Sequence, residues 1–224
     1  MKIVALLPMK GNSERVPNKN LKDFAGAPLY HRVMKTLIAS KYIDKVIVNT
    51  DSDVIKNDLK KHFGDNVIIV DRPEEIRGDF VSMNKVIECD INQVDADIYL
   101  QTHSTNPLLK TESVNKAIEK MLSILESGTH DSIFSVTKMQ TRLYKGDGTP
   151  FNHNPEELLR TQDLEPLYEE NSNFYLFTKD SFFKAGEKRI GKKPLMFEID
   201  KIEAVDIDEP QDFIIAEALY KLLV

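Results

Sequence analysis

The loop after the first hydrophobic run of the chain is rich in groups that bind phosphate. The run Ile3-Val4-Ala5-Leu6-Leu7 is followed by cations, a glycine and small polar residues, namely Lys10, Gly11, Asn12, Ser13, Arg15, Lys19 and Asn20. Arginine binds phosphate through two parallel hydrogen bonds, and lysine acts as a compact positive charge. Glycine and serine favour turns in which backbone N–H groups can point at an anion. The loop therefore predicts a triphosphate site, with a solvated surface loop as the alternative.

A pair of carboxylates near the end of the chain is the second group that could do chemistry. Asp206 and Asp208 are separated by Ile207 within the stretch Ala204–Phe213. We expect this stretch to begin as a strand, so that both carboxylates point to one face. Neighbouring carboxylates repel each other unless a cation lies between them, and oxygen ligands suit Mg²⁺. The pair thus predicts a magnesium site, although Asp208 followed by Pro210 is also typical of a helix start.

Alternating strands and helices are expected to position both groups. Short apolar runs predict strands at 3–7, 45–49, 67–70, 97–101, 132–136, 171–177 and 196–199. Apolar residues at helical spacing predict helices within 29–38, 55–63, 114–125, 182–185 and 213–223. This alternation predicts a Rossmann-like α/β fold with three layers, α/β/α, around a mostly parallel central sheet. In such a fold ligands bind at the carboxyl ends of the strands, where the cationic loop leaves the first strand.

Both chemical segments resemble the motifs of a known family. Residues 7–20, Leu-Pro-Met-Lys-Gly-Asn-Ser-Glu-Arg-Val-Pro-Asn-Lys-Asn, look like the opening motif of the acylneuraminate cytidylyltransferases, which include the CMP-sialic acid and CMP-Kdo synthetases. Residues 206–213, Asp-Ile-Asp-Glu-Pro-Gln-Asp-Phe, are similar to the end of those sequences. Lys10 stands where many members have Arg, and Glu14 places an anion where some have Lys. The resemblance covers nearly the whole chain and implies a nucleotidyltransferase fold.

The resemblance also implies roles for individual residues. It assigns nucleotide binding to the first loop and to one later arginine, at Lys10, Gly11, Asn12, Ser13, Arg15, Lys19, Asn20 and Arg72. It assigns binding of the acceptor sugar to Gln101 and Asn171. The alternative for Arg72 is an exposed salt bridge, and the alternative for Gln101 is a side chain bonded to nearby backbone. His103 lacks a Ser, Cys or carboxylate partner in a nucleophilic pattern, so we expect it to shape the pocket.

Length and composition indicate one globular domain. The chain has 224 residues, of which 41% are hydrophobic and 29% charged, which suits a single domain over 1–224. Gly and Pro interrupt the pattern over 138–170. The resemblance implies that this excursion contributes an arm to a homodimer, with Arg142, Arg160 and Gln162 as the residues of interest.

Charge and cysteine content exclude several classes of partner. A net charge of −6 argues against a nucleic-acid partner, and no segment predicts a membrane span. The single cysteine, Cys89, cannot form an internal disulfide and is expected on a half-buried helix. No export signal is recognisable at the first residues, so we expect a cytoplasmic protein.

The triphosphate and magnesium sites, taken with the family resemblance, predict a cytidylyltransferase that moves CMP from CTP to an acidic sugar and releases pyrophosphate. The implied acceptor is a nonulosonic acid such as N-acetylneuraminate, and Mg²⁺ is the expected cofactor. Lys19, Arg15 and Asp208 are expected to catalyse the transfer mainly by positioning and charge neutralisation, with the proton acceptor left open. The alternatives are a nucleotidyltransferase for Kdo or another sugar or nucleotide, a metal-dependent glycosyltransferase, and a nucleotide-sensing binding module. NAD is excluded because no Gly-x-Gly-x-x-Gly follows the first strand.

Overall fold

A seven-stranded sheet forms the centre of the protein, whose computed structural model describes residues 1–223. The strands are β1 (Ile3–Leu6), β4 (Lys45–Thr50), β5 (Val67–Asp71), β6 (Ile98–Thr102), β7 (Ser132–Met139), β8 (Leu167–Phe177) and β9 (Pro194–Glu198). Their order is β5-β4-β1-β6-β8-β7-β9, and β8 runs antiparallel to both β6 and β7. The other neighbouring strands pair in parallel, which confirms the predicted mostly parallel sheet.

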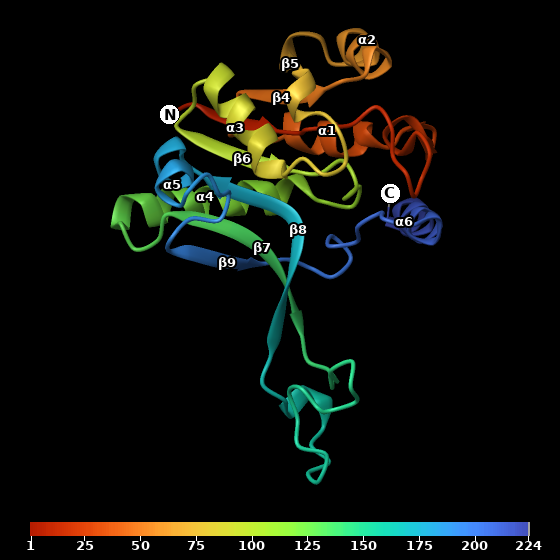
Figure 1. Cartoon of the computed structure of the whole chain (residues 1–224), viewed down its shortest axis with the longest axis vertical. Coiled ribbons are helices and arrows are strands. Elements are labelled where there is room, and N and C mark those ends of the chain that lie inside the picture. The colour runs from red at the N-terminus through yellow and green to blue at the C-terminus, as the bar shows by residue number, and fades with distance from the viewer. Residues whose placement is uncertain (224) are drawn as a thin grey trace.

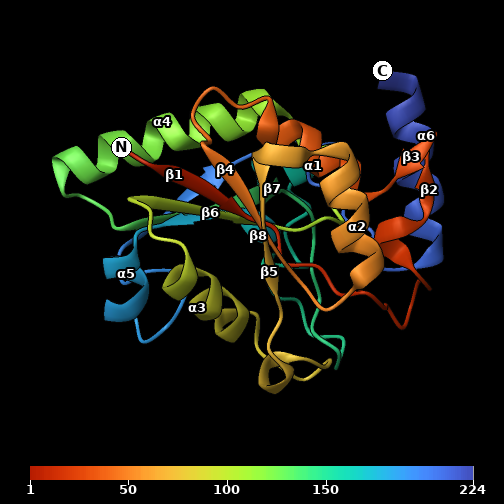
Figure 2. The same ribbon diagram turned by 90° about the horizontal axis from the view of Figure 1, so that it is seen from above.

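Helices cover both faces of this sheet and make the three predicted layers. They are α1 (Tyr30–Ile38), α2 (Asp53–His62), α3 (Met83–Gln93), α4 (Thr111–Ser127), α5 (Lys179–Lys184) and α6 (Pro210–Leu223). Ile3 and Ala5 of β1 share a buried cluster with residues of α1, α2 and α4, whereas Val4 and Leu6 pack with α3 and α5. Figure 2 shows α4 on one side of the sheet and α3 and α5 on the other. Among the helices described, none combines the length and hydrophobicity that a bilayer crossing requires.

Short elements complete the chain between these strands and helices. They are the 3-10 turns Lys19–Leu21, Gly64–Asn66, Glu74–Ile76 and Thr161–Asp163, and the small hairpin of β2 (Asp23–Phe24) and β3 (Ala27–Pro28). The start of α2 is fixed by the Ser52 side chain, which accepts a hydrogen bond from the Ile55 N–H at 3.4 Å. The start of α2 therefore lies directly after the carboxyl end of β4.

The segment before α6 differs from its prediction. Residues 204–208 are not a strand, because their backbone does not join the sheet. Ile207 is nevertheless fully buried, in a separate cluster with Phe24 and Phe213, and its N–H donates to the Thr105 carbonyl at 2.9 Å. Helix α6 packs on the same cluster through Phe213 and Ala216, whereas the Ile214 side chain is 69% exposed.

The predicted excursion is an arm that extends away from the sheet. Strands β7 and β8 continue past their neighbours as a twisted two-stranded ribbon, and residues 140–166 form irregular structure at its tip (Figure 1). The predicted excursion, 138–170, covers this irregular tip together with the adjoining strand ends 138–139 and 167–170. The arm exposes large apolar side chains, including Phe151 at 58% and Leu158 at 90%.

Candidate active site

Loops from distant parts of the chain meet at the carboxyl edge of the sheet. The loop after β1, the loop after β5 and the start of the segment after β6 surround a cavity of about 240 Å³. Its lining residues are Pro8, Met9, Lys10, Asn12, Ser13, Glu14, Arg15, Lys19, Asn20, Asp79, Met83, Ser104 and Thr105. The segment before α6 joins this edge through the hydrogen bond between Ile207 and Thr105. The predicted meeting of the cationic loop with the two aspartates is therefore present in the structure.

Gly11 places the first loop against the start of α2. Its N–H donates to Asp51 Oδ1 at 2.8 Å, and a Cβ at this position would lie 2.9 Å from Ser52 Cβ. The site needs a glycine because of this close approach. The Ser13 N–H donates to Asn12 Oδ1 at 3.0 Å. The expectation that Gly11 and Ser13 present free N–H groups to phosphate is thus wrong, since both groups have acceptors within the chain.

Lys19 is the deepest cation of the cleft. Its side chain is 9% exposed, and Nζ donates to the Ile207 carbonyl at 2.6 Å and lies 3.9 Å from Asp208 Oδ1. Burial lowers the pKa of Lys19, and the charges of Asp208 and Asp206 oppose that shift. An ammonium group has three donors, so Lys19 can bond the backbone and a ligand together.

Arg15 and Lys10 are more exposed and are held by carboxylates. Arg15 Nη2 lies 2.7 Å from Asp208 Oδ1, and Nη1 lies 3.4 Å from Glu209 Oε1. The charge of Asp208 and the carboxylate of Glu209 raise the pKa of Arg15. Lys10 Nζ pairs with Asp79 Oδ1 at 2.6 Å, which joins the first loop to the loop after β5. Both cations are therefore positioned in the cleft by partners that an anionic ligand can replace.

Asp206 is the buried member of the carboxylate pair. Burial raises the pKa of Asp206, a hydrogen bond from Thr105 opposes the rise, and the charge of Asp208 adds to it. Its Oδ1 atom is buried and has no hydrogen-bond partner among residues 1–223. An unpartnered buried carboxylate oxygen is costly unless a cation satisfies it. Asp208 does not cap α6 with its side chain; instead the Asp212 carboxylate accepts from the N–H groups of Asp208 and Glu209 at 3.0 and 2.7 Å.

Asn20 and Arg72 support the first loop from inside the protein. Asn20 Nδ2 donates to the Lys10 carbonyl at 2.9 Å, and its Oδ1 accepts from Ser104 Oγ at 2.6 Å. Arg72 is 3% exposed and donates to Asn49 Oδ1 at 2.8 Å, to the Asn49 carbonyl at 2.8 Å and to the Met9 carbonyl at 3.3 Å. Arg72 is therefore not the exposed salt-bridging residue of the alternative interpretation.

Gln101 belongs to a buried polar cluster that the sequence did not reveal. Its Oε1 accepts from Arg189 Nη1 at 2.7 Å, and Arg189 Nη2 donates to the Tyr175 hydroxyl at 2.9 Å. The Arg189 guanidinium also stacks on Tyr175, with 3.7 Å between its carbon and the ring centroid. His103 Nε2 lies 3.2 Å from Gln101 Nε2, and burial together with Arg189 lowers the pKa of His103 to about 3. A neutral imidazole is consistent with the expectation that His103 shapes the pocket. The basic tract 188–193 was the only sequence signal for Arg189.

The remaining predicted residues lie on the far strands and the arm. Asn171 accepts from Ser135 Oγ at 2.6 Å and donates to Thr137 Oγ1 at 2.8 Å, so its side chain is bonded to β7. On the arm, Arg142 donates to the Leu159 carbonyl, Arg160 pairs with Asp163 at 2.7 Å, and the Gln162 carbonyl accepts from Gln140 at 3.1 Å. These contacts stay within the arm.

The open sheet and the charged cleft at its carboxyl edge define a class of α/β proteins that bind a ligand where the strands end. A family model described as cytidylyltransferase matches residues 4–222. The chain belongs to the cytidylyltransferase family, which confirms the recognition made from residues 7–20 and 206–213.

Individual relatives agree with this family, and a solved structure shares the fold. An N-acylneuraminate cytidylyltransferase A of Danio rerio is 29% identical over 96% of this chain and 50% of its own length. The chain thus spans about half the length of that relative. A pseudaminic acid cytidylyltransferase of Campylobacter jejuni is 26% identical over 99% of this chain and 97% of its own. The fold matches a solved CMP:2-keto-3-deoxy-manno-octonic acid synthetase complexed with CTP, at a TM-score of 0.72 and 15% identity over 100% of both chains.

Proposed function

We propose that this protein transfers CMP from CTP to a hydroxyl group of an acidic sugar and releases pyrophosphate. The observation that carries the proposal is the cleft in which Lys19 and Arg15 lie 3.9 and 2.7 Å from Asp208. Family membership supports CTP as the nucleotide, and relatives named for N-acylneuraminate and pseudaminic acid support a nonulosonic acid as the acceptor.

The cations are arranged to neutralise a triphosphate. In the reaction, the sugar oxygen bonds to the α-phosphorus, and the bond to the oxygen that bridges the α- and β-phosphates breaks. Negative charge then grows on the leaving pyrophosphate, so fixed cations stabilise the transition state. Lys19 would act from the protected end of the cleft, and Arg15 and Lys10 would exchange their carboxylate partners for phosphate oxygens. Glu14 lines the same cavity and adds a negative charge there.

The two aspartates fit a magnesium ion. Asp206 offers a buried oxygen with no partner among the described residues, and Asp208 offers a half-exposed carboxylate beside it along the chain. Carboxylate oxygens together with substrate phosphates and water are the ligands that Mg²⁺ prefers. When bound there, Mg²⁺ would supply positive charge that polarises phosphoryl oxygens.

The acceptor would bind on the Gln101 side of the cleft. Arg189 Nη1 donates to Gln101 Oε1 at 2.7 Å, and Gln101 lies near the carboxyl end of β6, just before the cavity residues Ser104 and Thr105. Arg189 thus adds a guanidinium near the carboxyl edge of the sheet, which suits a substrate that carries a carboxylate. Asn171 would contact the acceptor only if its side chain gave up its hydrogen bonds to Ser135 and Thr137 of β7.

The arm would join two copies of the chain. It exposes Tyr144, Phe151, Leu158 and Leu159, by between 47% and 90%, on a ribbon that projects from the sheet (Figure 1). Apolar side chains in such a position are typical of an interface. We therefore propose that the protein forms a homodimer. We also propose a cytoplasmic location, in keeping with the free thiol of Cys89.

A pyrophosphate-release assay tests the proposal. Purified protein with Mg²⁺ and CTP is mixed with single eight- or nine-carbon sugar acids, and the CMP-sugar is identified by mass. We expect release that requires both CTP and a sugar acid, with UTP, ATP and GTP as the matched nucleotide controls. Tight CTP binding without turnover on any acceptor would favour a nucleotide-sensing module, and turnover of a nucleotide-sugar donor would favour a glycosyltransferase.

A further inference from the structure

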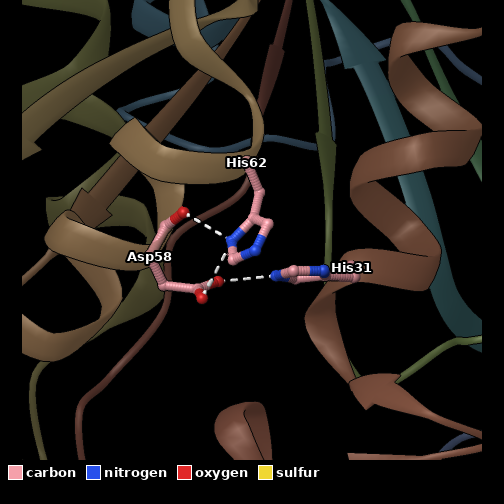
Figure 3. A group of neighbouring side chains, drawn as sticks. All are labelled: His31, Asp58 and His62. Carbon is pink, nitrogen blue, oxygen red and sulfur yellow. Dashed lines mark hydrogen bonds and ion pairs between the residues drawn. The ribbon is translucent and has the colours of Figure 1, made fainter.

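Two helices on one face of the sheet bring together two histidines and an aspartate. His31 lies on α1, and Asp58 and His62 lie one turn apart on α2, with the three side chains pointing at one another (Figure 3). His31 Nε2 is 2.6 Å from Asp58 Oδ2, and His62 Nδ1 is 3.0 Å from Asp58 Oδ1. One ligand atom from each residue lies within 4.8 Å of the other two.

These separations are close to those of a metal-ligand set. A tetrahedral ion with bonds of about 2.1 Å holds its ligands about 3.4 Å apart. The distances from His31 to Oδ2 and from His62 to Oδ1 of Asp58 are shorter than this by less than about 1 Å, and one ligand atom of each residue lies within 4.8 Å of the others, so side-chain rotations can bring the three to the required separation. A metal can therefore replace the hydrogen bonds without a change in the positions of α1 and α2.

The surroundings of the cluster also suit metal binding. The Tyr30 hydroxyl donates to Asp58 Oδ2 and orients the carboxylate. The side chains of His31, Asp58 and His62 are 7%, 21% and 42% exposed, so the site opens to solvent on the His62 side. An ion has a path to the site, and water can complete its coordination.

We propose that His31, Asp58 and His62 bind a divalent transition-metal ion of the zinc class. Two imidazoles with one carboxylate select zinc, cobalt or nickel over Mg²⁺, which prefers oxygen ligands. The ion links α1 to α2, and Ser52, which caps the start of α2, lies against Gly11 of the first loop. Its role is to stabilise this face of the protein, and the proposed CMP transfer does not require it.

Zinc titration of the metal-free protein tests the proposal. Protein freed of metal with a chelator is titrated with ZnCl₂ by calorimetry, without CTP or sugar, and with CoCl₂ by visible absorption. We expect about one zinc ion per chain, a rise in melting temperature with zinc, and the absorption of four-coordinate cobalt.

Two histidines outside the core supply the variant and its control. His62→Ala should weaken zinc binding at least about tenfold and remove the cobalt absorption, while His130→Ala, between α4 and β7, should bind as the unchanged protein does. Circular dichroism checks that both variants fold. Absence of zinc binding, or equal binding by His62→Ala and the unchanged protein, would overturn the proposal; the latter result would place the ion elsewhere.

Discussion

Replacement of Lys19 by methionine should abolish most of the activity while the fold is kept. Methionine fills nearly the same buried space without the charge, which limits the effect on packing. A unit charge at the observed 3.9 Å contributes about 4 kcal/mol when the effective dielectric constant is about 20. If Lys19 makes that contribution to a phosphate charge that develops in the transition state, kcat should fall by about a thousandfold.

Steady-state pyrophosphate release measures this loss, and a surface lysine supplies the control. Lys120→Met on α4 removes the same unit of charge at an exposed position and should change kcat less than about twofold. Circular dichroism and the urea unfolding midpoint should show that Lys19→Met is folded. A folded Lys19→Met protein with nearly normal kcat would refute the catalytic role of this cation.

Three further changes test the metal, the loop and a buried acid. Asp208→Asn removes a proposed Mg²⁺ ligand, so the Mg²⁺ concentration for half-maximal rate should rise at least about tenfold in a metal titration. Gly11→Ala places a Cβ 2.9 Å from Ser52 Cβ, so urea unfolding should show a loss of about 1–3 kcal/mol together with a raised KM for CTP. Burial raises the pKa of Asp90 to about 7 in the folded protein, so this group binds a proton that the unfolded chain has lost. The stability that Asp90 contributes should be present below pH about 4 and be lost as the pH rises through about 7, and Asp90→Asn should flatten this fall in urea unfolding between pH 5 and 8.

Each of these three predictions has an outcome that would contradict it. An unchanged Mg²⁺ titration for Asp208→Asn, with Glu209→Gln as the matched control, would remove Asp208 from the metal site. Gly11→Ala with normal stability and KM would show that the close contact with Ser52 does not matter. Equal slopes of stability against pH for Asp90→Asn and the unchanged protein would show that Asp90 is not the titrating group.

The strands could be predicted because their buried residues form short, continuous apolar runs. The prediction failed at 204–208, where Val205 and Ile207 alternate with polar residues as they would in a strand. There the Ile207 N–H bonds to the Thr105 carbonyl instead of to a sheet neighbour. The alternation of apolar and polar residues indicates which side chains are buried, but it does not indicate which backbone groups form hydrogen bonds with each other.

The site could be predicted where the chemistry was local in the sequence. Lys10, Arg15 and Lys19 share one loop, so their residue types indicated an anion site directly. Arg189 could not be found in this way, because it meets Gln101 only after β6 and β8 pair and the segment after α5 packs on Tyr175. The N–H of Gly11 was also misjudged, since its acceptor Asp51 lies 40 residues away in sequence.

A double-mutant cycle of Lys19→Met and Asp208→Asn tests most directly whether the cations and the acids work in one cleft. The quantity measured is kcat/KM for pyrophosphate release by each single variant, the double variant and the unchanged protein. Residues that act on the same phosphates should be coupled, so the double variant should lose at least about tenfold less than the product of the two single losses. Losses that simply multiply would show that Lys19 and Asp208 act independently, and would contradict the account of a single catalytic cleft.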